Sequence, residues 1–229
     1  KDVNSGEDNV AVGFGAGENL TTNAKNVLIG RNAGANLAAG IDGCVAIGFS
    51  ALDAAVDTGH YTVAIGQHAL GALTSGDRNI GIGYSTGLTL TSSNDCIFIG
   101  YEAGKDCDST GSTPAGCIYI GSRAGENLDD GTQNVAIGHQ AMRGNTENGN
   151  TPNNSVAIGY NALKNVPDGD DNVVIGFNAG PAMTVAGQSV FIGKDCGEAM
   201  DEGDYNTVVG HGAYKTAAGA NANYNTVVG

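Results

Sequence analysis

The amino-acid sequence predicts an all-β protein whose chain winds into a parallel β-solenoid, or β-roll. A Val-x-Ile-Gly step recurs along the 229 residues, an Ala usually follows three residues after the glycine, and turn-forming residues fill the rest of each unit. A unit of about 17 residues is too short to bury its own apolar face, so it has to stack on its neighbours. We therefore expect one elongated domain, residues 1–229, of about thirteen coils with one strand and one return segment each.

The period is defined by thirteen glycines that end the recurring steps, here called the marker glycines. Their spacing is nearly constant, and the two longest intervals separate Gly100 from Gly121 and Gly138 from Gly159. The full set is Gly13, Gly30, Gly48, Gly66, Gly83, Gly100, Gly121, Gly138, Gly159, Gly176, Gly193, Gly210 and Gly229.

Two columns of β-branched residues, here called the Val/Ile columns, alternate along each expected strand. The residue directly before the marker glycine is Ile or Val in all thirteen repeats, and the residue three before it is Val or Ile in eleven. Such alternation indicates a strand. We expect both columns to lie on the strand face that points into the coil.

The middle column, two residues before the marker glycine, is apolar as well and contains no charged or amide side chain. A strand that is apolar on both faces is normally buried on both faces. The column therefore predicts a homotrimer interface, with an apolar stripe on a monomer as the alternative. The candidate interface residues are Leu28, Phe98, Tyr119, Ala136, Val174 and Phe191.

Two further columns indicate how the coils are closed. The Asn column, four residues before the marker glycine, holds Asn in seven repeats and small hydrogen-bonding residues or Cys in the others. Stacked Asn side chains are expected to cap backbone groups of neighbouring coils. The third residue after the marker glycine is usually Ala and the seventh is mostly apolar, so the return segment is expected to be irregular or to form a short helical turn.

The composition excludes several classes of partner. The chain has a formal net charge of −14, whereas binding to nucleic acid or to an anionic membrane surface requires clustered Lys and Arg. No apolar run is long enough to span a bilayer, so membrane insertion is not expected. The sequence starts at Lys1 without a recognisable signal peptide, and we expect it to be a fragment of a longer fibre.

The segments NVAIGHQAM (134–142), SVAIGYNAL (155–163) and CVAIGFSAL (44–52) resemble repeats of two families. One is the β-roll head of trimeric autotransporter adhesins, and the other is the VAIG-x-x-AL repeat of bacteriophage tail-fibre shafts. The resemblance covers essentially the whole chain and implies a trimer of parallel rolls. The unit here is longer than the adhesin repeat, which favours the phage-fibre family.

The function expected from the repeat and the resemblance is structural. The chain would be a shaft segment of a phage tail fibre or similar virion fibre, located in the virion, that contributes to attachment to a cell-surface polysaccharide or protein receptor. The alternative is the head domain of a bacterial trimeric adhesin on the bacterial cell surface, which would bind host matrix or glycans.

No residue pattern indicates catalysis or a cofactor. The five cysteines are odd in number and occupy columns that take small or apolar residues, so we expect buried free thiols. The four histidines show no Ser–His–Asp or metal-ligand spacing, and no enzyme activity is expected. The acidic turns 167–172 and 201–205 are expected to be solvated, with weak calcium binding as the alternative.

Two features are candidates for receptor contact. Two repeats are four residues longer than the common unit, and their additional segments, 108–116 and 146–154, both contain Thr-Pro. Insertions in repeats map to loops on one face, often the binding face, which selects Thr113, Pro114, Thr151 and Pro152. An aromatic row directly after the marker glycines supplies the candidate glycan-stacking residues Tyr84, Tyr101 and Tyr160, although packing at a subunit seam is the favoured role of this row.

Overall fold

A computed structural model describes residues 6–54, 56, 60–107, 114–145, 150–165, 169–181, 187–198, 203–215 and 223–229. Within these ranges the chain forms thirteen three-residue strands and no helix. The strands are β1 (Val10–Val12), β2 (Val27–Ile29), β3 (Val45–Ile47), β4 (Val63–Ile65), β5 (Ile80–Ile82), β6 (Ile97–Ile99), β7 (Ile118–Ile120), β8 (Val135–Ile137), β9 (Val156–Ile158), β10 (Val173–Ile175), β11 (Val190–Ile192), β12 (Thr207–Val209) and β13 (Thr226–Val228).

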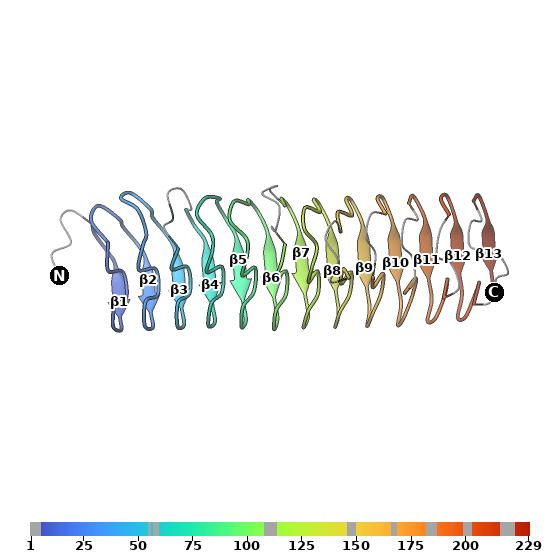
Figure 1. The fold of residues 1–229 in the computed structure, drawn as a ribbon, viewed down its shortest axis with the longest axis horizontal. Coiled ribbons are helices and arrows are strands. Elements are labelled where there is room, and N and C mark those ends of the chain that lie inside the picture. The colour runs from blue at the N-terminus through green and yellow to red at the C-terminus, as the bar shows by residue number, and fades with distance from the viewer. Residues whose placement is uncertain are drawn as a thin grey trace.

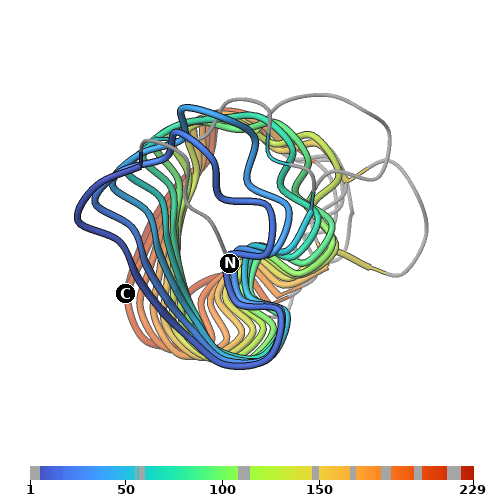
Figure 2. The same ribbon diagram turned by 90° about the vertical axis from the view of Figure 1, so that its left-hand side faces the viewer.

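All thirteen strands belong to one parallel sheet in the order β1 to β13. Equivalent residues pair across each strand boundary, as Val135 of β8 does with Val156 of β9. The coils stack into a rod (Figure 1), and their outlines nearly superpose when viewed along its axis (Figure 2). The predicted all-β parallel solenoid is therefore confirmed.

The return segments consist of turns, so the irregular alternative is correct and the short helical turn is wrong. Leu70 and Leu163, four residues after their marker glycines, have φ angles of 48° and 50°. These values lie in the left-handed region, which ends a helix and does not extend it. Nowhere in the part of the chain that the structure describes is there a helix long and apolar enough to cross a membrane.

The marker glycines from Gly13 to Gly210 are required by the close approach of adjacent coils. Gly48 has a φ angle of +136°, and a Cβ atom at this position would lie 2.5 Å from the carbonyl oxygen of Gly66 in the next coil. Gly13 has the same relation to Gly30. Only glycine combines such a φ with so short a distance between backbones, so contact between coils explains the most regular feature of the sequence.

Backbone hydrogen bonds between coils continue on the C-terminal side of each strand. In the coil of β8, the Gly138 amide donates to Ile120 O at 2.8 Å and the Gln140 amide donates to Ser122 O at 2.9 Å, both in the preceding coil. The Met142 amide then donates to Ala162 O of the following coil at 2.8 Å. Each coil is thus bonded to both neighbours over a segment longer than the strand itself.

The middle column points into the coil, and this reverses the orientation predicted from the sequence. The six candidate trimer-interface residues are all 0 % exposed within a single chain, so they cannot contact another subunit: Leu28, Phe98, Tyr119, Ala136, Val174 and Phe191. The Val/Ile columns lie on the outer face of the sheet instead. The alternation along the strand was predicted correctly, but the two faces were exchanged.

In nine of the twelve coils that have both positions, the fourth residue after the marker glycine varies in size in the opposite sense to the middle column; Ala11 with Gly17, Gly81 with Gly87 and Val208 with Tyr214 are the exceptions. A small Ala in the middle column is combined with Leu or Met at the fourth position: Ala46 with Leu52, Ala64 with Leu70, Ala136 with Met142 and Ala157 with Leu163. Larger residues are combined with glycine: Leu28 with Gly34, Phe98 with Gly104, Tyr119 with Gly125, Val174 with Gly180 and Phe191 with Gly197. A Cβ atom on Gly34 would lie 2.6 Å from Leu28 Cδ2. The two positions therefore share one volume inside each coil, which keeps the packing dense.

The Asn column forms the predicted ladder inside the rod. The backbone amide of Ser155 donates to Oδ1 of Asn134 in the preceding coil at 2.9 Å, and Asn134 Nδ2 donates to Pro152 O at 2.6 Å. Where the column holds serine, the hydroxyl takes over the acceptor role, as Ser155 Oγ does for the Asn172 amide at 3.0 Å. Buried backbone groups at this corner are thereby satisfied, and the expectation of capping Asn residues is confirmed.

Candidate interaction surface

The outer face of the sheet is apolar and uncharged along the whole rod. The Val/Ile columns contain only Val, Ile and, in the last two strands, Thr. Their side chains are half-buried or exposed: Ile29, Ile137 and Ile192 keep 38 %, 36 % and 38 % of their surface accessible. An exposed apolar face of this continuity is typical of a surface that packs against a partner.

An aromatic row runs beside this face, directly after the marker glycines. Its exposed members are Phe14, Phe49, Tyr84, Tyr101, Tyr160 and Phe177. Rings from adjacent coils stack on one another, with centroids 5.3 Å apart for Tyr84 and Tyr101 and 5.0 Å apart for Tyr160 and Phe177. The in-register coils thus place the rings at stacking distance along the axis.

Stacking limits what the three candidate glycan-binding tyrosines can do. A sugar stacks on the face of an aromatic ring, but Tyr160 lies between His139 and Phe177, with interplanar angles of 8° and 12°. Tyr101 is covered by Tyr84, at an interplanar angle of 10°, and by the Arg123 guanidinium, 5.8 Å from its centroid. The row therefore offers mainly ring edges, and this arrangement favours packing over glycan stacking.

Of the four candidate receptor-contact residues in the Thr-Pro segments, the structure describes Pro114, Thr151 and Pro152. Pro114 and Pro152 are buried, and Thr151 is half-buried. Both proline carbonyls accept hydrogen bonds from the core ladder, from Cys96 Sγ at 3.6 Å and from Asn134 Nδ2 at 2.6 Å. Burial of the two proline side chains does not favour them as receptor contacts, and Thr113 lies outside the described residues.

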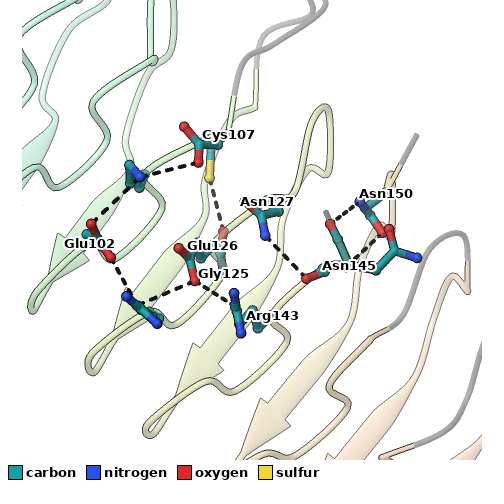
Figure 3. A network of polar contacts seen from close by, with 12 residues as sticks. Glu102, Cys107, Gly125, Glu126, Asn127, Arg143, Asn145 and Asn150 are labelled. Atoms are coloured by element: carbon teal, nitrogen blue, oxygen red, sulfur yellow. Dashed lines mark hydrogen bonds and ion pairs between the residues drawn. The ribbon is translucent and has the colours of Figure 1, made fainter. Parts of the chain in front are cut away.

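Two buried carboxylates and two partly exposed guanidinium groups form a chain of ion pairs across the coils of β6, β7 and β8 (Figure 3). Arg123 Nε lies 3.0 Å from Glu102 Oε2, and Arg143 Nε lies 2.6 Å from Glu126 Oε2. The two carboxylates are 8 % and 6 % exposed. Each buried carboxylate thus has a guanidinium partner, as burial of a charge requires, and the arrangement is structural.

Acidic and histidine side chains act as a second ladder, which sequence reasoning missed. At the sixth position before the marker glycine, His60 Nδ1 accepts from the Asp42 amide at 3.3 Å, and Asp77 Oδ1 accepts from the His60 amide at 3.0 Å. In the two acidic turns, Asp170 and Asp204 accept backbone amides at 2.8 Å and 2.9 Å. The sequence feature that could have revealed this second ladder is the recurrence of Asp or Asn at the sixth position before the marker glycine.

The described residues contain no candidate metal centre. No group of three or more His, Cys, Asp or Glu side chains there could hold a metal ion. Parts of the acidic turns, residues 167–168 and 201–202, lie outside those ranges.

The five cysteines are buried thiols, as predicted. Burial raises the pKa of Cys196 to about 11 and also raises the pKa of Cys44. A thiol with a raised pKa is protonated and unreactive at neutral pH, so these two side chains are structural.

Comparison of the chain with protein-family models, with curated proteins and with solved structures finds no match. The interaction surface is therefore interpreted from its own geometry.

Proposed function

We propose that the chain is a rigid shaft segment of a phage tail fibre or a similar virion fibre. The observation that supports this most directly is the uninterrupted register of thirteen parallel strands along one axis. At about 4.8 Å per strand such a stack is about 60 Å long. Continuous hydrogen-bond ladders and partly buried ion pairs between coils make it a stiff spacer.

The shaft assembles as a homotrimer through the outer face of the sheet. The Val/Ile columns form a strip about 60 Å long and about 10 Å wide, which is at the upper limit of the apolar patches that monomers expose. In a trimer this strip is shared between two neighbours, about 300 Å² each, so the aromatic row has to add to each contact, which remains smaller than the roughly 800 Å² per partner of a standard interface. Around a three-fold axis, one Val/Ile column of each chain would face one neighbour and the other column the second neighbour.

The assembly is tested by changing adjacent residues that point in opposite directions. Ile137→Asp places a charge on the outer face, where desolvation in an interface would be costly, and is expected to give a folded monomer. Ala136→Asp places the charge inside the coil and is expected to unfold the chain. Thr22→Asp, exposed on a return segment, serves as the control and should remain trimeric.

Sedimentation equilibrium and circular dichroism distinguish these outcomes. Two results would contradict the proposal that the outer sheet face forms the trimer interface. One is a wild-type chain that is monomeric at micromolar concentration, and the other is an Ile137→Asp variant that stays trimeric.

The biological role is tested separately, with antibodies raised against the purified chain. Labelling of tail fibres in electron micrographs of virions is expected. Labelling of a bacterial envelope would overturn the shaft proposal in favour of a trimeric adhesin. A glycan array with the intact fibre then tests whether the segment contributes to attachment.

A further inference from the structure

Only one pair among the five cysteines occupies the same column in adjacent coils. Cys96 and Cys117 both belong to the Asn column, directly before β6 and β7. Cys44 has Asn26 and Thr62 as its neighbours in that column.

The other two cysteines also lack a cysteine neighbour. Cys196 lies between Ala179 and Ala213 in the Ala column, and Cys107 lies in the seventh-residue column, between Leu90 and Leu128. The fold thus selects a single pair.

The backbone holds this pair at a separation that suits a disulfide. Ile97 pairs in register with Ile118, and the Ile97 amide donates to Cys117 O at 2.8 Å. Adjacent strands lie about 4.8 Å apart, within the roughly 4.4–6.8 Å between Cα atoms that a disulfide spans. The two side chains also point in the same direction, because Cys96 Sγ donates to Pro114 O at 3.6 Å and Cys117 Sγ donates to the equivalent carbonyl of the next coil, Gly131 O, at 3.2 Å.

The two thiols influence each other's ionisation. Their proximity lowers the pKa of Cys117 and raises the pKa of Cys96. Since the thiolate is the reactive form, Cys117 is the group that attacks first.

We propose that Cys96 and Cys117 are a modification site, a dithiol that a small disulfide such as oxidised glutathione converts into an intramolecular disulfide. The Cys117 thiolate attacks one glutathione sulfur and releases one glutathione thiolate. The Cys96 sulfur then attacks Cys117 in the mixed disulfide and releases the second glutathione. One oxidised glutathione is consumed, two reduced glutathiones form, and the two thiol protons pass to them.

The disulfide would close the coil that contains one of the two longest intervals. Marker glycines Gly100 and Gly121 bound this interval, and the bridge would join the two ends of that coil in the core. The thiols give up only weak hydrogen bonds, such as the one from Cys117 Sγ to Gly131 O at 3.2 Å. The oxidised form therefore keeps the native fold and resists opening of this coil.

The experiment refolds the reduced, full chain in glutathione buffers of increasing oxidised-to-reduced ratio, so that access to buried thiols is not limiting. Acid trapping and peptide mapping should identify the 96–117 disulfide as the main cross-link, and the oxidised protein should melt at a higher temperature than the reduced one.

Matched serine variants test the assignment. Serine already occupies this column at Ser155 and Ser189, so Cys117→Ser should fold and lose the cross-link, while Cys44→Ser should retain it. A different main pairing, or a chain that refolds fully reduced at ratios that oxidise a denatured control, would overturn the proposal. Neither result depends on trimer formation or on the shaft role.

Discussion

At the scale of single residues, the alternation between glycine and a large side chain in the return segments follows from packing. Gly125 has a φ angle of +62°, and a Cβ atom there would collide with the Tyr119 ring. Met142 occupies the equivalent position in the next coil with a φ angle of 49° and is fully buried. The left-handed conformation therefore does not by itself demand glycine at this position; the volume of the middle-column residue does.

A double-mutant cycle tests this shared volume. Tyr119→Ala should cost about 3–5 kcal/mol of unfolding free energy because it leaves a cavity. Gly125→Leu should cost about 1–3 kcal/mol because it overpacks the coil. The double variant reproduces the Ala46 and Leu52 combination, so its loss, measured by urea unfolding, should be well below the sum of the two. Additive losses would show that the positions do not share one space.

The Asn column makes a second prediction at this scale. Asn134→Ala removes the partners of the Ser155 amide and of Pro152 O, and each buried unsatisfied group costs about 1–3 kcal/mol. Asn134→Ser should lose less, because a serine hydroxyl can still accept the amide. Asn36→Ala, on the exposed return segment, is the control and should change the free energy of unfolding by under about 0.5 kcal/mol.

At the scale of the element, the strands and their period could be predicted from the sequence, but the direction of their faces could not. Three-residue strands alternate β-branched and variable residues, and both sets are apolar, so hydrophobicity alone does not distinguish inside from outside. The deciding signal was the inverse size of the middle column and the fourth position. The constant Val/Ile columns face outward, while the variable column tracks the size of its partner across the coil.

The candidate interaction surface could be predicted only in part, because hydrophobicity alone does not distinguish the inner strand face from the outer one. An apolar strand face beyond the one that fills the coil was expected and is present, but it consists of the Val/Ile columns and not of the six residues selected. Pro114 and Pro152 were selected as loop residues, yet their carbonyls are acceptors for the core ladder. The position of the two prolines in the additional segments did not reveal that they are buried.

Coil deletions test whether a strand and its own return segment form one unit. Removing 155–171 takes out one strand together with its return segment and joins Asn154 to Asn172. Every remaining middle-column residue then keeps its own residue at the fourth position after the marker glycine. Removing 160–176 takes out a segment of the same length, but combines Ala157 with Gly180 in one coil. The first deletion should melt close to the parent protein and the second clearly lower in scanning calorimetry. Equal melting temperatures of the two deletion variants would show that a strand and its own return segment do not form one structural unit.

At the scale of the whole molecule, the contacts of each coil reach only its two neighbours. The thirteen strands pair in sequence order without a crossover, and the ion pairs join adjacent coils in the same way. Stability is then approximately a sum over coils and their boundaries. The central coils have neighbours on both sides, whereas all three residues of β1 are exposed.

The marker glycines have one more consequence, which concerns how such a molecule can change its length. Each marker glycine that has a following coil packs closely against the marker glycine of that coil, so every coil lengthens the rod by the same distance along its axis. This holds for coils of the common length and for the longest coils. In-frame duplication or loss of one coding unit would lengthen or shorten the protein by a single step of about 4.8 Å. The length of the rod could therefore change during evolution by whole coils, independently of the sequence of the return segments.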